Sequence, residues 1–269
     1  MPKAKSKRKT KPRAVKAPQS SSPAGTMTLS AAMAALEKAG SAQTRKTYAR
    51  HCAPEPMFGV SFAVLKTLAK RIGVDPELAH ALWETGNFDA RILAVKVADP
   101  SRMSADDISR WAREARMGML VSYVAQLASE GPHAPILAAT WSASSNAAES
   151  GAMWLLIGQM AFRDEATPDS WFDGRLAEIE RTIRSAPNEL REAMNQTLIA
   201  IGCRSPALRK AAIAAAKRIG KVEVDHGDTA CKTPDAATYI DKSWAHSTSK
   251  GFPSPAAHER TREPMRVRC

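Results

Sequence analysis

The chain has 269 residues, of which 44% are hydrophobic and 6% aromatic, and its formal net charge is +12. This composition is typical of a soluble globular protein with one large domain or two small ones. No run of about 18 apolar residues is present, so we expect no membrane-spanning helix, and the basic N-terminus lacks the apolar stretch of a secretory signal. The four cysteines are widely spaced without a CxxC pair, which favours free thiols in a reducing compartment.

The excess positive charge lies at the two ends of the chain. Residues 1–18 contain eight Lys or Arg residues and no acid, and residues 244–269 have a net charge of +3, which leaves +1 for the middle. We expect a disordered basic arm over residues 1–27 and a disordered basic tail over residues 244–269, because neither can bury enough apolar surface to fold. The arm should associate with polyanions in a strongly salt-dependent way.

The middle of the chain, residues 28–243, shows apolar residues at the helical spacing i, i+3, i+4 and i+7 without alternating strand-like runs. Residues 78–100 predict a helix, a turn at Gly86 and Asn87, and a second helix that stops before Pro100. Further helical units are predicted over residues 105–129, 134–162 and 169–184.

Two later segments match each other, LREAMNQTLIAIG from Leu190 and LRKAAIAAAKRIG from Leu208. Each closes with a glycine, Gly202 or Gly220, placed to end its helix in a left-handed turn. A helix pair cannot bury its apolar stripe alone, so we predict an all-α solenoid of stacked pairs over residues 28–243. An irregular helical bundle is the alternative.

Three stretches resemble the DNA alkylation repair family: FGVSFAVLKTLAKRI (58–72), LAHALWETGNFDARILAVKVADP (78–100) and LREAMNQTLIAIG. The resemblance covers most of residues 45–242. It implies a C-shaped stack of HEAT-like antiparallel helix pairs whose concave surface cradles duplex DNA, with no cofactor. The best-known members of this family are glycosylases that release N3- and N7-alkylated purines.

Catalysis in the family requires a carboxylate that stabilises positive charge on the deoxyribose. Active members carry a Trp with an Asp four residues later, and an Arg on the next repeat. By resemblance these positions fall near Gly118, Ser122 and Ser150, and residues 116–128 contain no carboxylate. The catalytic residues therefore stay unassigned. The alternatives are a non-catalytic helical scaffold that binds nucleic acid or protein, and an enzyme that uses Asp225 or Asp228.

Basic residues cluster on several predicted helices, where they would contact the phosphate backbone of DNA without reading bases. A solvated outer face is the alternative for each, and Arg91 also suits an ion pair between repeats. Trp154 is a candidate for the groove or the core, Trp111 a surface candidate and Trp83 a core residue. The predicted DNA-binding residues are Arg45, Lys46, Arg50, Lys66, Lys70, Arg91, Arg113, Arg116, Trp154, Arg209, Lys210, Lys217 and Lys232.

The stretch VEVDHGDTACKTPDAATYI (222–240) combines acids, a histidine and a cysteine. Thr233 is the predicted N-cap of a helix that starts at Pro234, which would place Lys232 at a helix N-terminus suited to a phosphate. A polar loop between the last two helices is the alternative. The spacing of Asp225, His226, Asp228 and Cys231 fits no zinc site, and nothing orients a Cys231–His226 nucleophile, so no metal is expected.

We expect a cytoplasmic location near the nucleoid, or a nuclear one in a eukaryote, where SKRKTKPR would suit nuclear import.

Overall fold

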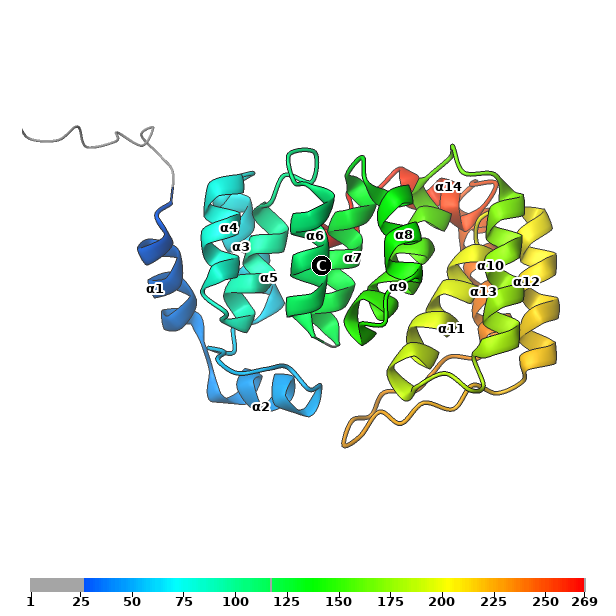
Figure 1. Ribbon diagram of the computed structural model, residues 1–269, viewed down its shortest axis with the longest axis horizontal. Helices are drawn as coiled ribbons and strands as arrows, with labels where there is room; N and C mark the ends of the chain where they lie inside the picture. Colours follow the sequence, from blue (N-terminus) through cyan, green and yellow to red (C-terminus); the bar gives the residue numbers. More distant parts are fainter. Residues whose placement is uncertain (1–26, 117, 269) are drawn as a thin grey trace, which may run out of the picture.

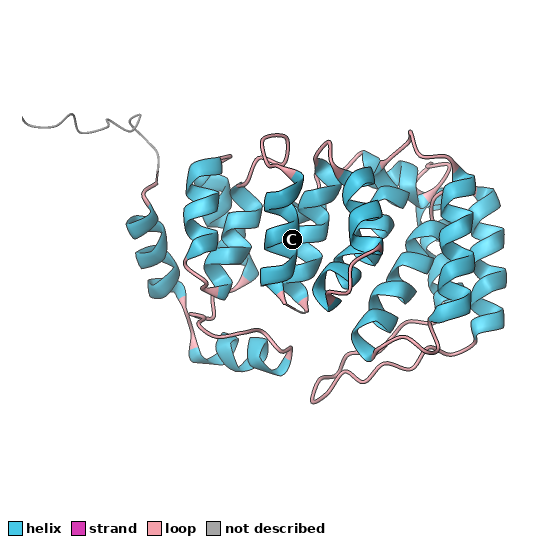
Figure 2. Ribbon diagram, viewed as in Figure 1, coloured by secondary structure: helices cyan, strands magenta, loops and turns pink. Residues whose placement is uncertain are grey.

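The computed structural model describes residues 27–116 and 118–268, and these residues form fifteen helices with no strand among them (Figure 1; Figure 2). The predicted basic arm, residues 1–27, lies outside the described residues except for Met27. No helix in the described part is long and apolar enough to cross a membrane.

Most helices belong to one of two layers that stack along the long axis of the molecule (Figure 1). The even layer contains α4 (Pro76–Glu84), α6 (Ala105–Ala115), α8 (Ala134–Ser142), α10 (Asp169–Thr182) and α12 (Pro206–Ile219). The odd layer contains α3 (Phe62–Ile72), α5 (Phe88–Val97), α7 (Met119–Glu130), α9 (Ala147–Arg163), α11 (Asn188–Gly202) and α13 (Ala236–Ser249). Two helices precede the layers, α1 (Leu29–Ala39) and α2 (Ala42–Arg50). The all-α solenoid predicted from the sequence is confirmed.

Local signals in the sequence set the helix ends. Asp75 caps α4 by accepting the N–H of Leu78. Gly86, with φ of 70°, makes the left-handed turn, and Asn87 then caps α5 by accepting the N–H of Ala90. The helix–turn–helix predicted over residues 78–100 is therefore confirmed.

The hydrophobic core is continuous along the stack. The odd helices contribute most of its buried residues. In α5 every residue except Arg91 is buried. Trp83 of α4 is fully buried, as predicted. The surface assignment of Trp111 is wrong, because this ring is buried and stacks on Trp83 with centroids 4.2 Å apart. The arginines that flank Trp111 in the sequence are more exposed, with 35% of the Arg110 side chain and 48% of the Arg113 side chain accessible.

The two matching segments do not end in the same way. Gly220 follows α12 with φ of 72°, so its predicted left-handed turn is confirmed. The same prediction for Gly202 is wrong, since this glycine is the last helical residue of α11. A Cβ atom added at Gly202 would lie 2.5 Å from Cδ1 of Ile240, so the glycine allows close approach of α13.

The C-terminal residues do not form the disordered tail that their composition predicts. Helix α13 continues to Ser249, and two short helices follow, α14 (Pro255–Arg260) and α15 (Met265–Arg268). The prediction failed because it counted apolar surface alone, whereas this segment is held by buried polar contacts. Arg266, for example, is only 5% exposed.

Candidate nucleic-acid interface

Positive charge is concentrated in the first three helices. Residues 28–72 contain seven Lys or Arg residues against two acids, whereas residues 73–268 contain 24 against 25. The corresponding net charges are +5 and −1. The folded part of the chain is therefore polarised along its length, and a polyanion is attracted to the end that carries α1, α2 and α3.

Helix α2 projects from the lower edge of the stack in Figure 1, outside both layers. Its sequence AQTRKTYAR contains three cations and no acid. Lys46 and Arg50 are exposed and have no ion pair in the part of the chain that is described. Arg45 donates to the carboxylate of Glu55 at 2.8 Å, and this hydrogen bond is the main reason that the pKa of Glu55 is lowered.

The segment that follows α2 is anchored by a buried acid. The carboxylate of Asp89 in α5 accepts the backbone N–H groups of Phe58 at 2.6 Å, Gly59 at 3.0 Å and Val60 at 2.8 Å. The hydroxyl of Tyr48 in α2 donates to the carbonyl of Val60 at 2.6 Å. Burial, and then the nearby Asp89 carboxylate, raise the pKa of Tyr48, so its hydroxyl stays a donor. Asp89 lies in the first turn of α5, and nothing in the neighbouring sequence reveals this long-range role.

The α6–α7 turn brings a further cation close to α2. Arg116 is exposed and has φ of 62°, in the left-handed region that non-glycine residues rarely occupy. A Cβ atom added at Gly118 would lie 3.7 Å from the carbonyl oxygen of His51, so the turn lies beside the C-terminal end of α2. Arg116 therefore belongs to the same basic surface as Lys46 and Arg50.

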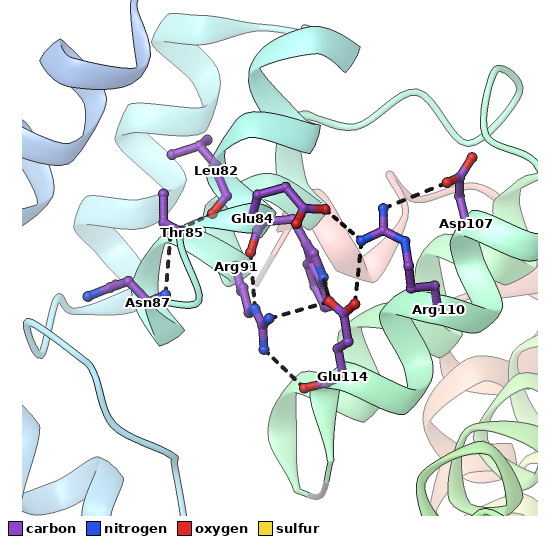
Figure 3. A network of polar contacts seen from close by, with 9 residues as sticks. Leu82, Glu84, Thr85, Asn87, Arg91, Asp107, Arg110 and Glu114 are labelled. Carbon is purple, nitrogen blue, oxygen red and sulfur yellow. Dashed lines mark hydrogen bonds and ion pairs between the residues drawn. The ribbon is translucent and has the colours of Figure 1, made fainter.

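Arg91, in contrast, connects two repeats (Figure 3). Its guanidinium lies 4.8 Å from the centroid of Trp83, donates to the carbonyls of Trp83 at 3.2 Å and Glu114 at 3.0 Å, and pairs with the Glu114 carboxylate at 3.4 Å. Glu114 also accepts from the indole N–H of Trp83 at 2.6 Å and from Arg110 at 3.4 Å. Because each of its three guanidinium nitrogens makes one of these contacts, Arg91 serves as an inter-repeat ion pair, one of the roles open to it from the sequence.

Four other residues predicted to contact DNA instead make contacts within the protein. Lys66 donates to the carbonyl of Arg268 at 2.6 Å, and Arg113 pairs with Glu149 at 2.6 Å. Arg209 pairs with Asp241 at 2.7 Å. Trp154 is 4% exposed and lies in the core.

The remaining predicted cations are exposed and have no ion pair among the described residues, but they lie at two ends of the molecule. Lys70 lies in the last turn of α3, one turn beyond Lys66. Lys210 and Lys217 are on α12, at the opposite end in Figure 1, and Lys232 is in the loop before α13. The structure therefore brings together Lys46, Arg50 and Arg116, and it separates them from the cations of α12.

The resemblance to the family points to Gly118 and Ser122 for the catalytic Trp and Asp, and neither residue carries a carboxylate. Gly118 is the N-cap of α7 and Ser122 lies in its first turn, and Gln126 follows one turn later with its amide 3.4 Å from the Ser122 hydroxyl. Glu149, the nearest acid by sequence in the following repeat, is 6% exposed. It accepts hydrogen bonds from Arg113 and from the hydroxyl of Ser144. Its carboxylate therefore connects α9 to Arg113 of α6.

The polar loop of residues 220–235 also projects from the lower edge of the stack (Figure 1). Helix α13 begins at Ala236, and its N-cap is Asp235, so the predicted N-cap at Thr233 is wrong by two residues. The Thr233 hydroxyl instead donates to Glu192 at 2.9 Å. Lys232 consequently lies four residues before the helix and not at its N-terminus.

The acids of this loop stabilise turns. Asp225 accepts the N–H of Gly227 at 2.8 Å, and Asn188 holds the backbone of Asp225 through two hydrogen bonds. His226 contacts the Thr233 hydroxyl at 2.9 Å. Within the described ranges, no group of three or more His, Cys, Asp or Glu side chains is placed to hold a metal ion.

Comparisons with known proteins agree with this architecture. The family model described as "DNA alkylation repair enzyme" matches residues 32–240. Two uncharacterized proteins, from Listeria monocytogenes and Listeria innocua, are each 28% identical over 205 residues, which cover 74% of this chain and 89% of the relative.

A solved structure is similar over 84% of this chain and 95% of its own, with 32% identity and a TM-score of 0.74. It is described as a new family of proteins related to the HEAT-like repeat DNA glycosylases with affinity for branched DNA structures. The extent of the family match and the shared HEAT-like fold establish that this chain belongs to the DNA alkylation repair enzyme family.

Proposed function

We propose that this protein binds DNA through the surface formed by α2 and the α6–α7 turn, prefers branched DNA, and does not excise bases. The observation that carries this proposal is the segregation of charge, with +5 over residues 28–72 and −1 over residues 73–268. The similarity to a solved protein described as having affinity for branched DNA supports the choice of ligand.

The exposed cations of this surface would contact phosphates. Lys46, Arg50 and Arg116 offer charged donors without an intramolecular ion pair among the described residues. Lys and Arg contacts to phosphate provide affinity without base readout, and each releases condensed counterions. Because α2 is rigidly joined to α5 through the Asp89 and Tyr48 hydrogen bonds, its cations are presented on a preorganised element.

The basic arm adds a second cationic element. Its eight cations precede α1 in the chain, so they are tethered to the helix that comes before α2. A tethered second contact gains affinity from its high effective concentration when two duplexes are close together. A branched substrate supplies that arrangement, at the nucleoid or in the nucleus.

The composition of α7 argues against excision of alkylated purines. Departure of a cationic base requires stabilisation of positive charge on the sugar, which a carboxylate provides. Gly118 and Ser122 offer none, and Glu149 is committed to Arg113.

Binding is tested with a four-way junction and a linear duplex of equal length, each titrated over a range of salt concentrations. Base release is tested in parallel with N7-methylguanine and N3-methyladenine in methylated duplex DNA, against boiled protein. We expect tighter binding to the junction, salt-sensitive affinity and no lesion-dependent release.

The surface is tested with the double variant Lys46→Gln/Arg50→Gln. The salt slope of the logarithm of the binding constant should fall by about 2 if both cations contact phosphate. The matched control is Lys210→Gln/Lys217→Gln, which removes the same charge from α12 and should leave the slope near that of the wild type. A larger fall of the salt slope in the control than in the α2 variant would place the DNA at the α12 end. Lesion-dependent base release would show that the protein is a glycosylase and would overturn the proposal that it does not excise bases.

A further inference from the structure

The last residues of the chain run back across the odd layer as a C-terminal strap, residues 250–268. The strap starts after α13, and its helix α14 packs against α9 and α13, while α15 packs against α7, α5 and α3. Its main chain is joined to the end of α11, where Ala256 donates to the carbonyl of Cys203 at 3.1 Å. The strap therefore contacts helices from nearly the whole length of the solenoid.

The strongest contact of the strap is made by Arg266. Its guanidinium donates to the carbonyls of Val95 at 2.6 Å and Lys96 at 3.1 Å, which lie at the C-terminal end of α5. It also forms a two-pronged pair with Glu130 at the end of α7, with a closest approach of 2.7 Å. Both side chains are largely buried, at 7% and 13% exposure. One cation thus neutralises the negative ends of two neighbouring helices.

Two lysines of the odd layer hold the main chain of the strap from the other side. Lys96 of α5 is 3% exposed and donates to the carbonyl of Arg266 at 2.7 Å. Lys66 of α3 donates to the carbonyl of Arg268 at 2.6 Å. The strap is therefore bound through its backbone as well as through its arginine.

A second group of ion pairs fixes the middle of the strap. Glu259 of α14 pairs with Arg163 at the end of α9 at 3.1 Å, and with Arg268 at 2.6 Å. Arg260 pairs with Glu165 at 3.2 Å. Arg163 is the last residue of α9, and Glu165 follows it by two residues, so this group lies at the C-terminal end of α9.

These contacts change the mechanics expected of a solenoid. In a stack of repeats each repeat contacts its immediate neighbours, so the curvature of the whole accumulates from small local rotations. The strap adds contacts between helices that are distant along the stack, from α3 to α13. It also lies beyond the span of the family match, which ends at residue 240.

We propose that the C-terminal strap is a clamp that fixes the curvature of the solenoid, and thereby the spacing between α2 and the loop of residues 220–235. These two elements project from the edge of the stack opposite to the strap (Figure 1), so a change of curvature moves them relative to each other. This inference rests on the proposed function in one respect: the fixed spacing sets the preference for branched over linear DNA.

The test uses the full-length chain with Arg266→Met, which keeps the apolar stem of the side chain and removes the guanidinium. The matched control is Arg262→Met, because Arg262 lies in the same strap, is 45% exposed and approaches Glu259 only at 3.7 Å. Small-angle scattering measures the shape, hydrogen exchange measures opening of α3 and α5, and DNA titrations measure the ratio of junction to duplex affinity.

In Arg266→Met we expect a larger maximum dimension, faster exchange in α3, α5 and α15, and a midpoint of thermal unfolding lowered by about 10 °C, as for loss of one partner of a buried pair. The ratio of junction to duplex affinity should fall about five-fold or more, a loss of ~1 kcal/mol in selectivity. Affinity for the linear duplex should stay within two-fold, since Arg266 lies away from the α2 surface. Arg262→Met should match the wild type in every measurement.

Unchanged scattering and exchange in Arg266→Met would overturn the clamp. A changed shape with an unchanged affinity ratio would overturn its role in DNA selection. If the wild type shows no preference for junctions, the proposed function fails, and the clamp is still decided by scattering and exchange. Should Arg266→Met fail to fold, Glu130→Gln removes the ion pair and retains the contacts of Arg266 with the carbonyl oxygens of α5, so the same measurements apply.

Discussion

The carboxylate of Asp89 accepts the backbone N–H of Val60 at 2.8 Å, and this bond joins the start of α5 to the segment that follows α2. The same carboxylate binds the N–H groups of Phe58 and Gly59, so three donors of an irregular segment depend on one side chain. A buried acid in the second repeat thus determines where the basic helix α2 is held.

Replacement of Asp89 by Asn should therefore destabilise the protein and displace α2. The amide retains one acceptor atom and loses the negative charge, so at least one buried N–H group is left without a partner. We expect the free energy of unfolding to fall by about 3 kcal/mol, measured by urea denaturation. Asp99→Asn is the control, because Asp99 only caps the adjacent Ser101 turn. Equal losses in the two variants would contradict the anchoring role.

Glu149 is predicted to be structural. Glu149→Gln weakens the contact with Arg113 and the bond from Ser144, and we expect a loss of about 1–3 kcal/mol in unfolding free energy. Affinity for DNA should stay within two-fold of the wild type. Glu178→Gln removes a more exposed acid, paired with Arg175 at 2.8 Å in the same helix, and should cost less than half as much. A loss of DNA binding in Glu149→Gln alone would instead assign Glu149 to the interface.

The thiol of Cys203 should react only after unfolding. Cys203 is 1% exposed, and burial raises the pKa of its thiol to about 12, so almost no thiolate forms at neutral pH. Cys52 and Cys231 are exposed and should be labelled rapidly in the native protein. With a thiol reagent at pH 8, Cys203→Ala should retain the full rapid amplitude and lose only the amplitude released by denaturant. A reduced rapid amplitude would show that the α11–α13 contact opens in the native state.

Acid should destabilise the fold below about pH 4.5. The pKa values of six carboxyls are lowered in the folded state, largely by hydrogen bonds and ion pairs: Glu55, Asp99, Asp107, Asp164, Glu180 and Asp235. A carboxyl with a lowered folded pKa stabilises the protein above its unfolded pKa, and this contribution is lost as the pH falls through the folded value. Unfolding free energy measured in urea should therefore be level from pH 6 to 5 and decline below.

The variant Asp235→Asn separates one contribution to this acid response. The hydroxyl and the backbone N–H of Thr238 lower the pKa of Asp235 at the start of α13. The variant should be less stable than the wild type at pH 6, and the difference should shrink toward pH 3. A constant difference across this range would show that the cap acts without its charge.

Much of the fold could be predicted from the sequence because its determinants are local. The Gly86–Asn87 turn, the cap at Asp75 and the apolar spacing of the helices are all contained in short windows. The solenoid then follows from the need of each helix pair to bury its apolar stripe.

The interface and the C-terminus were harder to predict because their determinants are distant in sequence. In the sequence, Lys46 and Lys66 are both lysines on basic helices. Only the structure shows that Lys66 donates to the backbone carbonyl of Arg268, 202 residues later. Trp111 is flanked by charges, and only the position of Trp83 in another helix shows that it is buried. Residues 250–268 contain few apolar side chains, so their order depends on carbonyl groups and acids that the pattern of hydrophobicity does not reveal.

The Arg266 contacts also determine when, during synthesis, the early repeats acquire all their native contacts. The carbonyls of α5 that Arg266 binds leave the ribosome some 170 residues before the arginine that caps them. During translation the early repeats therefore fold with the C-terminal end of α5 and the Glu130 carboxylate unpaired. A nascent chain that stops before Arg266 lacks this cap, so termination there yields a protein with every repeat present and its first repeats loosened.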